Sequence, residues 1–174
     1  PEKLTEIIKY AKDRKLRVIL MPIVLLDLPI SNEWRGTLKP LDWEEWFNSY
    51  RDMITHFAII AENTHVEVLV VGSELVSTQD KVPQWTRTIN AVRKIFKGQL
   101  TYSSNWDNYM QVPFWNQLDL ISMNSYWKLG NGKNASVAEI MQNWKEIQRD
   151  VLSFTQKQNK PLMELSPEAF AHAL

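Results

Sequence analysis

The strongest constraint on the fold of this chain is its alternation of amphipathic helical segments with short runs that are apolar throughout. Residues 3–13 carry their apolar side chains on one helical face, and an apolar run follows at 16–25. About five strands are expected in all, the others at 66–71, 100–103, 118–123 and 160–163. Strands that are apolar on both faces and are separated by amphipathic helices predict a parallel sheet covered by helices.

Local signals mark where the helices begin and end. Asp42 and Ser136 each precede a glutamate by three residues, which is the spacing of a helix N-terminal capping box. Pro83 lies in the first turn of another predicted helix, for which Gly98 is the expected C-terminal cap. The intervening segment 26–40 is too long for a simple connection, and we therefore expect it to be a binding loop.

Two architectures fit this order of elements: a doubly wound open sheet and a (β/α)₈ barrel. No glycine-rich turn follows any strand, which disfavours the doubly wound sheet. A barrel takes roughly 250 residues, whereas this chain has 174. We therefore expect residues 1–174 to form one partial TIM-barrel domain of α/β class, a fragment truncated at both ends.

Composition excludes several classes of function. Lys and Arg number 20 and Asp and Glu number 20, so no excess of positive charge predicts a nucleic-acid partner. The chain has no cysteine, which excludes a disulfide framework, a thiolate metal site and a cysteine nucleophile. Its histidines lack metal-ligand spacing, and its longest apolar run is too short to span a bilayer. We expect no metal, no cofactor and no membrane insertion, and the sequence carries no indication of oligomeric state.

Polar and aromatic residues follow four successive predicted strands. Glu74 comes directly after the second strand, in the run Gly-Ser-Glu-Leu, and Glu164 follows the last. The residues after the two strands between them include Asn105, Trp106, Asn124, Tyr126 and Trp127. Because the carboxyl ends of parallel strands gather at one edge, these side chains are expected to share a site.

Two carboxyl groups beside tryptophan and amide side chains are the groups that glycosidic bond cleavage requires. One carboxyl group protonates the leaving oxygen while the other attacks or stabilises the oxocarbenium-like carbon. Tryptophan faces can stack on the apolar faces of sugar rings, and amides or hydroxyls can bind the ring hydroxyl groups. The strand ends therefore predict a glycan as the substrate, and a polysaccharide substrate favours export from the cytoplasm.

Three runs together resemble glycoside hydrolase family 113: Trp-Arg-Gly at 34–36, Asp-Trp-Glu-Glu-Trp-Phe-Asn-Ser-Tyr at 42–50 and Val-Val-Gly-Ser-Glu-Leu at 70–75. The resemblance implies a (β/α)₈ barrel and a retaining glycosidase of β-1,4-mannanase type. It implies that Glu74 is the acid/base and that the nucleophile is Glu164 or, less naturally, Glu168. Trp34 and Arg35 are candidates for binding sugar, or for holding the loop through a cation–π contact.

A second hypothesis is a catalytically inactive sugar-binding protein on a barrel scaffold. It is motivated by the last predicted strand, where only Leu162 and Met163 separate Pro161 from Glu164. Binding of an oligosaccharide without hydrolysis would favour it.

Overall fold

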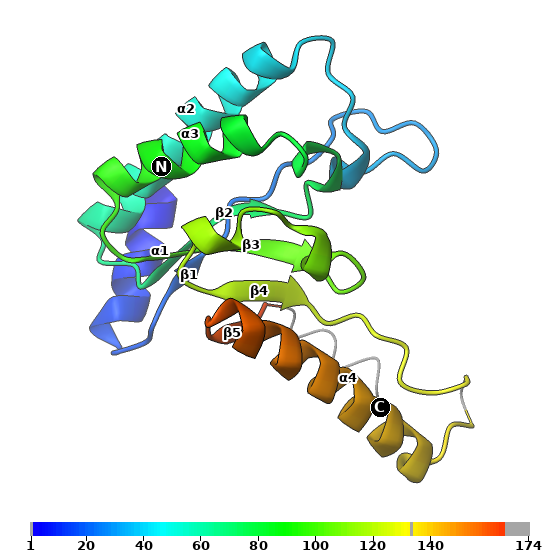
Figure 1. Cartoon of the computed structure of the whole chain (residues 1–174). Helices are drawn as coiled ribbons and strands as arrows, with labels where there is room; N and C mark the ends of the chain where they lie inside the picture. Colours follow the sequence, from blue (N-terminus) through cyan, green and yellow to red (C-terminus); the bar gives the residue numbers. More distant parts are fainter. Residues whose placement is uncertain (1, 133, 166–174) are drawn as a thin grey trace.

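A computed structural model describes residues 2–132 and 134–165 of the chain. Its centre is a five-stranded sheet in which every neighbouring pair of strands is parallel (Figure 1). The order across the sheet is the order along the chain: β1 Ile19–Leu20, β2 Val68–Ser73, β3 Gln99–Asn105, β4 Ile121–Asn124 and β5 Leu162–Glu164. A doubly wound sheet reverses its strand order at a switch point, and no reversal occurs among these strands. The sheet is the partial barrel that the sequence predicts.

Helices cover the outside of this half-barrel. Helices α2 and α3 pack together beside β2 and β3, and α4 runs alongside β4 and β5 (Figure 1). The α-helices are α1 Glu2–Asp13, α2 Trp43–Asn63, α3 Val82–Ile95 and α4 Val137–Gln158. Short 3-10 turns lie between them, at η1 Arg35–Thr37, η2 Val76–Thr78, η3 Tyr109–Gln111 and η4 Trp115–Gln117.

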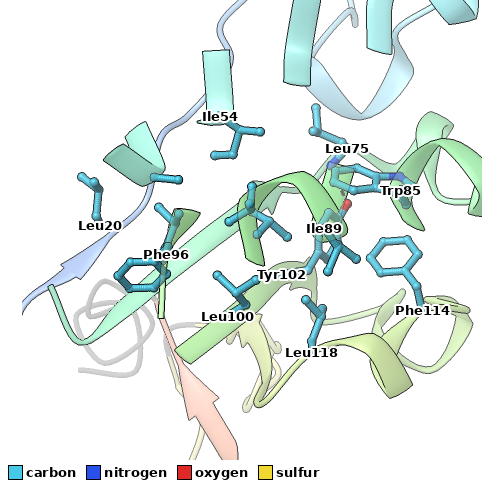
Figure 2. Close-up of a cluster of buried hydrophobic side chains, with 14 of the residues drawn as sticks. Leu20, Ile54, Leu75, Trp85, Ile89, Phe96, Leu100, Tyr102, Phe114 and Leu118 are labelled. Carbon is cyan, nitrogen blue, oxygen red and sulfur yellow. Dashed lines mark hydrogen bonds between the residues drawn. The ribbon is translucent and has the colours of Figure 1, made fainter. Parts of the chain in front are cut away.

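The two faces of the sheet differ in what they bury, because successive side chains of a strand point to opposite faces. The helix-side face forms one apolar core, to which Leu100 and Tyr102 contribute (Figure 2). The other face carries hydroxyl groups that bond to one another: Thr101 Oγ1 donates to Ser122 Oγ at 3.0 Å. Polar strand residues are thus concentrated on the concave side of the sheet, which faces the interior in a closed barrel.

The first strand is much shorter than the apolar run at 16–25 predicts. Only Ile19 and Leu20 pair with β2, and Ile23 and Leu25 are 45% and 78% exposed. An apolar run becomes a strand only where it finds a partner, and among the described residues β1 has a partner on one side alone.

Two of the predicted caps are confirmed and one is wrong. Asp42 accepts from the backbone N–H groups of the first helical turn of α2, and Ser136 Oγ accepts from that of Glu139. Gly98, however, does not cap α3, because the helix ends at Ile95 and Phe96 is its extended C-cap. A Cβ on Gly98 would lie 2.3 Å from the Phe96 ring and 3.0 Å from the Glu67 carbonyl oxygen. Gly98 is therefore a point of close packing.

Candidate active site

Glu74 lies where β2 ends and the chain turns sharply. The pairing of β2 with β3 slips between Val70 and Ser73, and the Glu74 backbone is left-handed, with φ of 54°. Left-handed backbone is uncommon for a residue with a side chain and costs energy that the surroundings must offset. The Glu74 N–H remains bonded to the Ser103 carbonyl oxygen at 2.8 Å, so the strained residue is still tied to β3.

Buried aromatic side chains pack against the backbone on both sides of Glu74. A Cβ on Gly72 would lie 2.7 Å from the Trp85 ring and 3.1 Å from the Tyr102 ring, so glycine is needed there. The Tyr102 hydroxyl accepts from the Leu75 N–H at 2.8 Å (Figure 2). It also accepts from Gln79 Nε2 at 3.2 Å. Burial raises the pKa of Tyr102 far above its usual value, so this hydroxyl stays neutral.

The Glu74 carboxylate is buried and receives a donor on each oxygen. Arg35 Nη2 donates to Oε2, and Asn124 Nδ2 donates to Oε1. The side chain is 10% exposed. An ionised carboxylate only accepts hydrogen bonds, so both contacts fit the charged form of Glu74. Two residues predicted to bind sugar, Arg35 and Asn124, thus contact the predicted acid/base.

Arg35 comes from the long loop between β1 and α2. It begins η1, which lies against η2, the turn that follows Glu74. Trp34 folds back over the turn, and its indole ring occupies the place of a Cβ on Gly36. Trp34 is still 36% exposed. The loop therefore does reach the strand ends, and the charged group that it brings there pairs with Glu74.

Trp106 and Trp127 form a second group beyond the ends of β3 and β4. Their ring centroids are 6.2 Å apart with an interplanar angle of 62°, and both side chains are half-buried. Tyr126, next to Trp127, is 44% exposed. Asn105 is in register with Asn124, which places it beside the residue that holds Glu74.

Several buried polar atoms around these strand ends have no hydrogen-bond partner among the described residues. They are the Oγ atoms of Ser73 and Ser125, Oδ1 of Asn105 and Nε of Arg35. Ser104 Oγ is unpaired too, but Ser104 shares the register of Met123 and so lies on the helix side. Buried polar atoms are nearly always paired, so a cluster of unpaired ones needs an explanation. A ligand rich in hydroxyl groups would supply both donors and acceptors to such a set.

Glu164 occupies the last position of β5 and is half-buried. Its Cα is in register with Met123, a fully buried core residue, and the Leu165 N–H bonds to the Met123 carbonyl oxygen at 3.1 Å. Leu162, two positions earlier on the same face, packs against the helix-side core. In a regular strand this alternation directs Glu164 to the helix side, whereas Met163 shares the register of Ser122. Glu168, the other candidate nucleophile, lies outside the described residues.

Two residues that support the site are not among the sequence candidates. Ser103 Oγ donates to Asn124 Oδ1 at 3.2 Å, and this contact orients the amide so that its nitrogen faces Glu74. The alternation of polar residues in β3 could have indicated Ser103. Nothing local indicates that Tyr102 holds the residue after Glu74, because Tyr102 lies in β3 and Leu75 lies 27 residues earlier, in the turn after β2.

The described residues contain no group of three His, Cys, Asp or Glu side chains that could hold a metal ion. None of the helices among them is both long and apolar enough to cross a membrane.

Comparison with solved structures finds β-mannanases of the same architecture. The GH113 β-mannanase AaManA from Alicyclobacillus acidocaldarius, in complex with ManMIm, matches with a TM-score of 0.81 and 27% identity over 94% of this chain and 50% of its own. Two further GH113 β-1,4-mannanase structures match with TM-scores of 0.74 and 0.72 and identities of 28% and 29%. The first match covers 97% of this chain and 54% of the other chain. The second covers 92% of this chain and 50% of the other. This chain thus spans about half the length of these structures.

Among curated proteins, none matches the chain significantly. The model of Glycoside Hydrolase Family 113 matches residues 1–166, which is nearly all of the chain. Together with the parallel half-barrel and the buried glutamate at the end of β2, this match assigns the chain to its family: it belongs to Glycoside Hydrolase Family 113.

Proposed function

We propose that the chain is the catalytic part of a glycoside hydrolase that cleaves β-linked glycans, of β-1,4-mannan type, with retention of configuration. The observation that carries the proposal is the buried Glu74 carboxylate at a strand end, held by Arg35 and Asn124. Unpaired polar atoms and the Trp106–Trp127 pair beside the same strand ends support a sugar as the ligand. The substrate class follows the β-1,4-mannanases among the similar structures.

In the proposed mechanism Glu74 and Glu164 act in two steps. A Glu164 oxygen attacks the anomeric carbon, the bond to the leaving oxygen breaks, and Glu74 gives its proton to that oxygen. Water then attacks the same carbon and gives its proton to Glu74, and the bond to Glu164 breaks. The carboxyl groups of a retaining enzyme stand about 5–5.5 Å apart. The register of β5 directs the Glu164 side chain to the helix side. Glu164 can act in this way only if its carboxylate turns to the concave side and faces Glu74.

The test of Glu74 is Glu74→Gln in the full-length protein, with Glu44→Gln on the exposed surface of α2 as the matched control. We expect mannan hydrolysis to fall by about 10²–10⁴-fold, the usual contribution of a general acid, while oligosaccharide binding persists. With an activated aryl glycoside, azide should restore turnover of Glu74→Gln and yield a β-glycosyl azide. Hydrolysis at the wild-type rate would remove Glu74 from the mechanism.

Covalent trapping in the full-length wild-type protein identifies the nucleophile. A 2-deoxy-2-fluoro glycoside with a good leaving group forms a stable ester with the attacking carboxylate, and peptide mass mapping locates that ester. We expect the label on Glu164. A label on Glu168 would leave the mechanism intact but move the nucleophile.

The register of Glu164 favours one alternative, a sugar-binding protein without catalysis on the same scaffold. Such a protein would bind mannooligosaccharides by calorimetry, would not hydrolyse them, and would not be labelled by the fluoro glycoside.

A further inference from the structure

The two donors to the Glu74 carboxylate are attached to the fold in different ways. Asn124 is a β4 residue, 6% exposed, and its amide orientation is set by Ser103. Arg35 comes from a 3-10 turn 39 residues away in sequence. The loop thus brings a positive charge to the Glu74 carboxylate, to which β4 supplies a neutral amide.

Among the described residues, the Arg35 side chain forms one hydrogen bond, to Glu74. Nη2 is engaged by Glu74, and Nε is buried without a partner among the described residues. Its side chain is 23% exposed. A guanidinium group in this position stabilises negative charge on the carboxylate and fixes the plane of the carboxylate through a charge-assisted hydrogen bond.

Building on the proposed function, we infer that Arg35 is a positioning residue for Glu74. The contacts of Glu74 are those of the ionised carboxylate, which is the form that exists after the proton has passed to the leaving oxygen. Arg35 therefore stabilises the charge that appears on Glu74 as the leaving group is protonated. A residue with this role should affect the rate most for substrates whose leaving oxygen must be protonated. It should affect the rate least for substrates whose leaving group departs as a stable anion.

The test compares kcat/KM, which reports steps up to the first irreversible one, for two substrates of the full-length protein. A β-1,4-mannooligosaccharide must have its leaving oxygen protonated, whereas 2,4-dinitrophenyl β-mannoside releases a stable anion without a proton. Arg35→Met should lose about 10- to 100-fold on the oligosaccharide, as expected for a hydrogen bond to a charged group, and little on the aryl glycoside. Arg35→Lys should recover much of the loss.

Arg87→Met is the matched control, because Arg87 pairs with the exposed Glu44 on the helical surface. Thermal melts establish that each variant is folded, and Arg35→Gln replaces Arg35→Met if the latter does not fold. An equal loss on both substrates, or no recovery with lysine, would overturn the inference while leaving the proposed function standing. A folded wild type that hydrolyses neither substrate would overturn the proposed function itself.

Discussion

Replacing Tyr102 with phenylalanine tests whether the Tyr102 hydroxyl group holds the backbone next to Glu74. The side chain is fully buried, and its hydroxyl accepts from two buried donors, the Leu75 N–H and Gln79 Nε2. Removal of an acceptor leaves each buried donor unpaired, at about 1–3 kcal/mol each. We therefore expect Tyr102→Phe to lower the free energy of unfolding by about 2–6 kcal/mol.

Tyr50→Phe is the matched control within the same aromatic cluster. Tyr50 is 4% exposed, and its hydroxyl donates to the Val71 carbonyl oxygen at 2.8 Å. Its loss removes one ordinary hydrogen bond, worth about 0.5–1.5 kcal/mol, and leaves a carbonyl group, which tolerates the loss of a partner better than an N–H does.

Urea unfolding followed by tryptophan fluorescence measures both variants. With a urea slope of about 1–3 kcal/mol per molar, the midpoint for Tyr102→Phe should fall by about 1 M or more, and that for Tyr50→Phe by clearly less. Tyr102→Phe should also reduce kcat, because Leu75 follows Glu74 directly. Equal midpoints for the two variants would refute the role of the Tyr102 hydroxyl as an anchor.

Two further variants test the packing and the charges around β2. Gly72→Ala forces a methyl group to within 2.7 Å of the Trp85 ring, so overpacking should cost about 1–3 kcal/mol and melting should fall by about 2–4 °C per kcal/mol. It should also reduce kcat, whereas Gly132→Ala has open space around the added Cβ but a φ of +87°, so it should cost stability through backbone strain without lowering kcat. An unchanged melting temperature for Gly72→Ala would contradict the close contact. Burial raises the pKa of Glu67, but Lys12 and the Val18 N–H together outweigh it and hold that pKa below its ordinary value of 4.5. A carboxyl group whose pKa is lowered in the folded state stabilises the fold at pH values above its ordinary, unfolded-state pKa. Glu67→Gln should therefore lower the urea midpoint at neutral pH. The difference from wild type should narrow below pH 4.5 and vanish below the lowered pKa; a difference that persists in acid would exclude this contribution.

Local sequence determined the class of fold and the position of the central carboxylate. Helical periodicity, the caps at Asp42 and Ser136, and doubly apolar runs each depend on a few neighbouring residues, so they can be identified without the fold. A parallel sheet then follows, and with it the expectation that Glu74 stands at a functional edge. The confirmed order β1 to β5 shows how far such local rules extend.

Tertiary structure alone decided what each residue at that edge contacts. Arg35 and Asn124 lie 39 and 50 residues from Glu74, and their meeting depends on the loop path and on strand register. The same applies to Glu164, whose position in the sequence matches a strand end but whose register is that of the core residue Met123. A register slip and a left-handed residue turn Glu74 toward Asn124. Such features arise from pairing between distant segments, and no pattern of neighbouring residues encodes them.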